Sequence, residues 1–325
     1  MKKRLLSAVI LLIGLTSLAP AQSLLELIAQ IDSASLADYV SPLAKSYGCA
    51  MGTGWAQSAK SHKFLGFDLG VRLMVIQIPE AGRTFDAHVR YCYFDSSKMD
   101  TVWRDTIIQD AATMFGKKGS DDSWVPSGAI GIPPALPGGL GVSIMPFLVP
   151  QASVGLPVGA ELTVRYVPWP FKGTTVQFLG FGLKEEVSRF LAGGKLPLNL
   201  AAQVFYQKFL IGDELNSNTW GGQVLASFSF LGLSPHAGIG FDKTSMNINY
   251  TFKFNDPRFE LGPPPRFYTE EVELPVAFNY DSGLRWRGNL GATATFGLMF
   301  VSLDLNRDFT SAYNSITLGT GLSIR

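Results

Sequence analysis

Strict alternation between apolar and polar residues in one segment limits most strongly what this chain can fold into. At every second position from Leu65 to Val75 the residue is apolar. The residues between these positions are, in order, Gly66, Asp68, Gly70, Arg72 and Met74. Because a β-strand points successive side chains to opposite faces, this segment has one apolar face and one Gly-rich face with two charges. The pattern recurs behind an export signal, which is typical of an outer-membrane β-barrel.

The first 21 residues predict a cleaved signal peptide. A basic start, Lys2 to Arg4, precedes an apolar core over residues 5–18, and residues 19–21 fit the small-x-small cleavage rule. The alternative is an uncleaved membrane anchor. That apolar core is short for a helical span, which needs about 20 residues. The sequence therefore predicts an exported chain in the bacterial outer membrane.

Residues 22–48 differ in kind from the rest of the chain. Apolar residues recur there at three- and four-residue spacing from Leu24 to Leu43, which predicts an amphipathic helix, or two short helices broken near residues 33–35 or at Pro42. The segment could plug a barrel, cap its rim or lie on a membrane surface. Its low basic charge argues against a surface binder, because such helices are rich in Lys and Arg. Docking to the barrel is favoured.

Residues 49–325 are assigned to the barrel. Further alternating runs contain Val158, Leu198, Val224, Leu290, Val301 and Ile316. Each run has about nine to eleven residues, the length that a tilted membrane strand needs. With weaker candidates at 84–94, 139–149, 174–183 and 236–252, the sequence predicts an all-β, transmembrane antiparallel barrel of about ten to fourteen strands. The phase of the alternation shifts near Gly297, which indicates a turn or a bulge.

Two stretches rich in charge and proline, 96–137 and 253–275, are expected to be long loops. Residues 184–194 have Val187, Phe190 and Leu191 at helical spacing and end at two glycines, which predicts a short helix. The low share of charged residues, 16% against a usual figure of about 25%, agrees with a lipid-facing exterior.

Polar residues between the apolar ones should face the lumen. They could brace the wall or select solutes. The candidate polar residues of the lumen are Asp68, Arg72, Glu161, Arg165 and Gln203. Three tryptophans near strand ends, Trp169, Trp220 and Trp286, are candidates for an aromatic belt at the membrane interface.

No pattern of residues predicts catalysis, a cofactor site or a metal site. The three histidines are far apart, and His236 near Ser234 and Asp242 is the nearest approach to a catalytic triad. A net charge of +1 gives no electrostatic case for nucleic acid. The two cysteines, Cys49 and Cys92, could pair in an oxidising compartment or remain two unrelated residues.

Several segments resemble a family of uncharacterised outer-membrane proteins from Bacteroidetes and similar bacteria. The most specific are Gly52-Thr53-Gly54-Trp55 and His62-Lys63-Phe64-Leu65-Gly66-Phe67-Asp68, and residues 39–44, 155–162, 181–184 and 196–200 add to the likeness. The resemblance covers residues 36–250 and implies location and architecture rather than a reaction. More loosely, a helical segment before a barrel is similar to the fatty-acid outer-membrane transporters.

These features predict a passive channel or transporter for small molecules, including hydrophobic ones, rather than an enzyme. The alternative is a non-conducting barrel that anchors an envelope partner through its loops. The expected partners are outer-membrane lipid and the barrel-assembly machinery, with a hydrophobic small molecule as candidate cargo. One departure is the ending Ile324-Arg325, because outer-membrane barrels usually finish on an aromatic residue read by that machinery.

Overall fold

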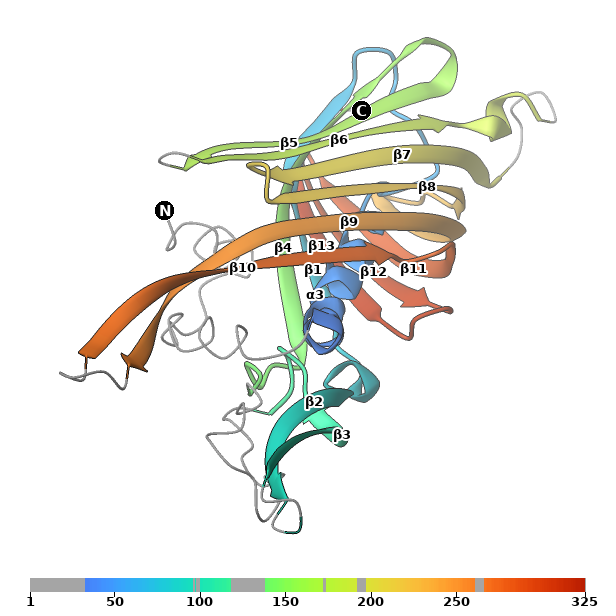
Figure 1. Cartoon of the computed structure of the whole chain (residues 1–325). Helices are drawn as coiled ribbons and strands as arrows, with labels where there is room; N and C mark the ends of the chain where they lie inside the picture. Colours follow the sequence, from blue (N-terminus) through green and yellow to red (C-terminus); the bar gives the residue numbers. More distant parts are fainter. Residues whose placement is uncertain are drawn as a thin grey trace.

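A closed antiparallel barrel of ten strands surrounds a single described helix (Figure 1). The computed structural model describes residues 33–95, 97, 100–117, 138–171, 174–191, 197–260 and 266–324. The predicted fold class is therefore confirmed. The predicted signal peptide lies outside the described residues.

The barrel strands follow one another around the ring nearly in chain order, as a meander. They are β1 (Phe67–Gln77), β4 (Ile144–Gly155), β5 (Ala160–Phe171), β6 (Thr174–Glu185), β7 (Asn199–Ile211), β8 (Leu215–Ser227), β9 (Leu233–Glu260), β11 (Arg285–Phe296), β12 (Met299–Asp308) and β13 (Asn314–Ile324). The last strand pairs with the first, with Ile324 opposite Phe67, and this pairing closes the ring. Closure leaves the ring without a free strand edge, which suits a sheet in lipid.

The two rims of the barrel differ. At one rim, where β1 ends, the chain leaves the barrel to form the hairpin of β2 (Thr84–Asp95) and β3 (Asp100–Ala112). At this same rim β9 runs beyond the wall and pairs with β10 (Arg266–Asp281). We call it the hairpin rim. The opposite rim, where β1 begins and β13 ends, is called the turn rim.

The wall has one apolar and one polar face, as the alternation predicts. Along β12, Met299, Val301, Leu303 and Leu305 are exposed on the outer face, and Ser302 and Asp304 are buried on the inner face. At the turn rim a turn at Gly297, which has a φ of +60°, joins β11 to β12 and accounts for the predicted shift of phase. The outer face of the wall is therefore apolar and the inner face polar.

Helix α3 (Ser33–Gly52) lies inside the hairpin-rim half of the barrel. The predicted helix covered residues 22–48; residues 22–32 lie outside the described part, and the observed helix continues to Gly52. Pro42 does not break it. Small residues let the helix fit: a Cβ added at Gly48 would lie 2.9 Å from Oγ1 of Thr244 on the wall.

The helix and the wall near the hairpin rim share one apolar core. Tyr47 stacks on Phe209 with ring centroids 5.5 Å apart, and Met51 is fully buried beside them. Inward apolar residues near the hairpin rim complete the cluster, among them Met74, Ile76, Met145, Phe147, Phe178 and Ile211. Since these residues are buried together, the helix is part of the folded core.

Three sequence predictions need correction. Residues 253–260 and 266–275 belong to β9 and β10, and β3 occupies residues 100–112, so neither predicted loop is wholly irregular. Strands that project beyond the wall need no apolar alternation, and charges and prolines hid them. The described part of the predicted helix at 184–194 is instead the end of β6 followed by a short 3₁₀ turn, Val187–Arg189, because Lys184 and Glu185 still pair with β7.

The barrel domain was assigned from residue 49, but its first strand begins at Phe67. Cys49 is a buried free thiol whose Sγ lies 3.4 Å from the carbonyl oxygen of Tyr313. It is therefore not in a disulfide. Burial raises the pKa of this thiol to about 12.

Candidate functional site in the barrel lumen

The lumen is occupied by residues 33–66, which we call the plug. It consists of α3 and an irregular segment that runs from Thr53 to Gly66, where β1 begins at the turn rim. The end of α3 is fixed locally, because the Thr53 hydroxyl donates to the carbonyl of Ala50 over 2.9 Å. Gly54 then takes a φ of +70°, which turns the chain away from the helix axis.

Trp55 fixes the segment against the wall. Its indole stacks on Phe205 with centroids 4.9 Å apart, and the guanidinium of Arg165 lies 3.8 Å from the ring centroid. Two wall glycines make room for the ring: an added Cβ at Gly180 or Gly182 would lie 2.9 Å from an indole carbon. The indole N–H donates to the carbonyl of Met51 over 2.7 Å, so its polar atom is paired.

Wall side chains donate to the backbone carbonyls of the irregular segment. Arg165 donates to Thr53 O over 2.7 Å. Thr293 donates to Gln57 O over 2.8 Å. Lys184 donates to Ser58 O over 3.1 Å.

Other wall side chains accept from its backbone N–H groups. Ser227 Oγ accepts from Ala59 over 3.1 Å, Glu186 accepts from Ser61 over 2.9 Å, and Glu161 accepts from His62 over 3.1 Å. Buried backbone groups outside regular secondary structure need such partners, because water does not reach them. These bonds, together with those of the three donors, form what we call the latch.

A buried charge cluster lies at the end of the latch that is nearer the turn rim. Glu161 pairs with Lys184 Nζ at 2.9 Å and accepts from Nδ1 of His62 at 2.8 Å. Asp68 accepts from Gln57 over 3.1 Å, and one of its oxygens lies 3.8 Å from Nε2 of His62. The cavity beside this cluster has a volume of about 10 Å³, the space of about one water molecule.

All five candidate polar residues of the lumen are buried inside the barrel. The structure brings Asp68 and Glu161 together around His62, and Arg165 and Gln203 both approach Trp55. Arg72 lies apart from them against Phe300, with its Cζ 5.0 Å from the ring centroid. Its two terminal nitrogens have no hydrogen-bond partner among the described residues.

A second charge cluster lies in the lumen nearer the hairpin rim, and the sequence analysis did not identify it. Asp242 pairs with Arg285 and, over 3.4 Å, with Arg287; Asp308 lies 3.8 Å from Arg285. A Cβ added at Gly52 would lie 2.5 Å from a carboxylate oxygen of Asp242, so α3 ends against this cluster. The same alternation that identified Asp68 could have found these inward positions on β9, β11 and β12.

The residues nearest to a triad in the sequence do not assemble one. His236 pairs with Asp304 through Nε2, and its Nδ1 lies 3.4 Å from the carbonyl of Ser234. Asp242 is instead paired with the two arginines. Among the described residues, no group of three or more His, Cys, Asp or Glu side chains is placed to hold a metal ion.

Two of the three candidate belt residues lie on the outer face. Trp220 is 46% exposed and Trp286 is 50% exposed. The ring of Phe241 lies between them, with centroids 6.1 and 5.9 Å away. The side chain of Trp169 lies outside the described part of the chain. Within the described helix there is no stretch long and apolar enough to span a membrane.

Comparisons with known proteins give weak structural likeness and one family. A double mutant of the Rh. blastica porin has 11% identity and a TM-score of 0.16, covering 80% of this chain and 100% of that chain. A structure described as "Asymmetric conductivity of engineered proteins" has 8% identity and a TM-score of 0.18, covering 79% of this chain and 99% of that chain. No curated protein matches. A family model matches residues 1–324, so the chain belongs to the Family of unknown function DUF6588.

Proposed function

We propose that this protein is a bacterial outer-membrane β-barrel closed by its own N-terminal segment, and that it serves as a membrane-embedded platform for the two hairpins at one rim. The observation that carries the proposal is the plug. Its helix shares an apolar core with the wall, and its irregular segment is bonded to wall side chains through backbone atoms. A lumen filled in this way supports anchoring better than passive flow.

The outer face supports a place in a bilayer. Along β11, Trp286 and Phe296 are both exposed and mark the two ends of an apolar band. Ten residue steps cover about 34 Å of strand, and a tilt of about 40° reduces that to about 26 Å of height. This matches the apolar band of about 25 Å on outer-membrane barrels. Aromatic residues at both ends suit the two headgroup levels.

A second candidate function is a gated conduit for small molecules, hydrophobic ones included. The polar half of the lumen favours it, because the segment from Thr53 to His62 is held by hydrogen bonds and ion pairs rather than by an apolar core. Such contacts can be exchanged for water when a segment moves, whereas an apolar core resists wetting. In this alternative the plug leaves its latch and a solute follows the polar wall.

Membrane fractionation tests the location. The mature chain should be recovered in the detergent-extracted outer membrane and should resist extraction with carbonate or urea. Recovery as a soluble periplasmic protein would remove the basis of both candidate functions.

Conductance in planar bilayers separates the platform from the conduit. The comparison is between the wild-type chain and Arg165→Met, which removes the donor to Thr53 O while keeping the apolar stem of the side chain. Both proteins are first shown to be folded by heat-modifiable migration on gels. The platform predicts that neither conducts. Stepwise openings in the variant, absent or rare in the wild type, would favour the gated conduit.

A further inference from the structure

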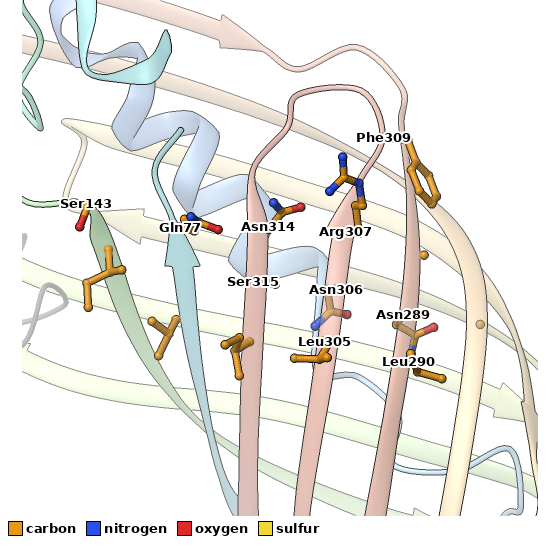
Figure 2. Close-up of a pocket in the computed structure, with 15 residues that line it drawn as sticks. Gln77, Ser143, Asn289, Leu290, Leu305, Asn306, Arg307, Phe309, Asn314 and Ser315 are labelled. Atoms are coloured by element: carbon orange, nitrogen blue, oxygen red, sulfur yellow. The ribbon is translucent and has the colours of Figure 1, made fainter. Parts of the chain in front are cut away.

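The outer face of the barrel has a groove near the hairpin rim, away from the lumen (Figure 2). Its volume is about 660 Å³, within the range of about 300–1,000 Å³ that is usual for small-ligand sites. It crosses the neighbouring strands β11, β12, β13 and β1 and reaches the start of β4. Outer-face side chains of these strands form most of its floor, and Gly238 of β9 and the inward positions Asn289, Asn306 and Ser315 complete the lining.

Strand register arranges those side chains in two rows. In the row nearer the rim, Arg307 stands opposite Gly288 on one side and Asn314 on the other, and Gln77 follows on β1. Two residues further from the rim on each strand is a wholly apolar row: Leu290, Leu305, Ile316 and Val75. Because successive outward residues are two apart, both rows lie on one face. The groove is therefore polar and cationic nearer the hairpin rim and apolar further from it.

Arg307 is available for a ligand. It is exposed, and it makes no ion pair with any described residue. The groove lining contains no carboxylate. Gly288 opposite has no side chain to cover the guanidinium, and the ring of Phe309 lies 3.0 Å from where its Cβ would be. Oδ1 of Asn314 is buried and lacks a hydrogen-bond partner among the described residues.

The polar row lies at the level of a membrane interface. Trp286 is half exposed on the outer face two residues before Gly288, and its carbonyl accepts from the N–H of Phe309 over 2.9 Å. Indole rings favour the headgroup level, so Arg307 is placed where lipid phosphates lie. The apolar row is then placed at the depth of the first acyl carbons.

We propose that this groove binds one anionic glycerophospholipid of the phosphatidylglycerol type. Arg307 donates to the phosphodiester, for which its planar fork of N–H groups is suited. The headgroup hydroxyls lie beside the amide group of Asn314, and the acyl chains cover the apolar row. One unpaired cation matches one phosphodiester better than the two phosphates of lipid A. The proposal rests on the outer face lying in a bilayer, but it is independent of whether the lumen conducts.

Native mass spectrometry of the detergent-purified full chain, titrated with palmitoyl-oleoyl phosphatidylglycerol, tests the site. The wild type should bind a first phosphatidylglycerol molecule more tightly than any further one. Arg307→Gln should weaken the binding of that first molecule at least tenfold. Lys208→Gln is the matched control, since Lys208 is an outward cation on β7, far around the ring from the groove. The affinity of Lys208→Gln for phosphatidylglycerol should stay within twofold of the wild-type value. Equal binding by wild type and Arg307→Gln would overturn the proposal.

Two further measurements define the ligand. Diacylglycerol with the same chains lacks the phosphate and should bind at least tenfold more weakly than phosphatidylglycerol. Gly288→Leu should also reduce binding by filling the groove beside Arg307. Equal binding of diacylglycerol, or retention of lipid A in place of phosphatidylglycerol, would contradict the proposed ligand. Fractionation of the wild-type chain is scored separately, so failure of the membrane location is distinguished from failure of this site.

Discussion

The guanidinium of Arg165 lies over the indole of Trp55 and at the same time donates to the carbonyl of Thr53, two residues earlier in the plug. One wall residue therefore holds both a side chain and the backbone of the same segment. A cation over an indole is worth about 2 kcal/mol or more when both are shielded from water, as they are here. The pair is the point at which the helical part of the plug passes into the latch.

Trp55→Ala should destabilise the protein by about 3–5 kcal/mol, because it empties a large volume between two wall glycines and Phe205. The cost is measured by urea unfolding in lipid vesicles. Trp220→Ala is the control, since that ring lies half exposed on the outer face. Equal losses for the two variants would mean that Trp55 does not anchor the plug.

Lys184→Met should cost about 3–5 kcal/mol, because Glu161 would keep its charge in the lumen without its nearest cation. Adding Glu161→Gln should recover part of that loss. Lys243→Met is the matched control: Lys243 pairs with Asp281 at 2.9 Å, but both side chains are substantially exposed, so the expected cost is about 0–1 kcal/mol. Strictly additive losses for the Lys184 and Glu161 variants would contradict the coupling.

Leu303→Arg should cost about 2–4 kcal/mol in lipid vesicles, because Leu303 lies on the outer face near the middle of β12. Phe309→Arg, at the hairpin rim, should cost about 0–1 kcal/mol, since the penalty falls near the interface. Both variants are measured in vesicles of one lipid composition, because the penalty for the arginine exists only where its position lies in a bilayer. A larger loss at Phe309 than at Leu303 would show that the apolar band is misplaced.

Cys49 reports whether the plug is seated. Its thiol is buried, and with a pKa of about 12 it is protonated at pH 7 to 9, so a maleimide should not label it in the folded protein. The measurement uses Cys92→Ser to leave one thiol, and complete labelling is expected in urea. In the Cys92→Ser background, Trp55→Ala should label faster than the Cys92→Ser parent at matched barrel content. Rapid labelling of the folded Cys92→Ser protein would contradict the buried plug.

Much of the wall could be predicted from the sequence, and the reason is physical. An apolar outer face and a packed polar inner face impose a period of two on the wall strands, so residues 65–75 already revealed both faces. The inward placement of Asp68 and Glu161 follows from the same period. The extension of β9 and β10 beyond the wall could not be predicted in this way, because strands that project beyond the wall need no apolar alternation.

The interior arrangement was the least predictable part. The period tells which residues point inward but not what they meet there, and the latch joins residues more than 90 positions apart, as Glu161 to His62 and Arg165 to Thr53. The irregular segment gives no signal of its own, because wall side chains satisfy its backbone. The helix could be predicted, but the need for small residues at Gly48 and Gly52 is seen only from the wall side chains that lie against them.

Pairing of β1 with β13 closes the barrel, and the plug is the stretch of chain directly before β1. Its helix begins near the hairpin rim, where Ser35 bonds to the backbone of His88, and its irregular part leaves at the turn rim. The sheet must therefore wrap around its own leading segment, and the seam between the first and last strands is the step that encloses it. Occupancy of the lumen is in this sense decided during biogenesis: a ring that joined before its leading segment was in place would trap that segment outside.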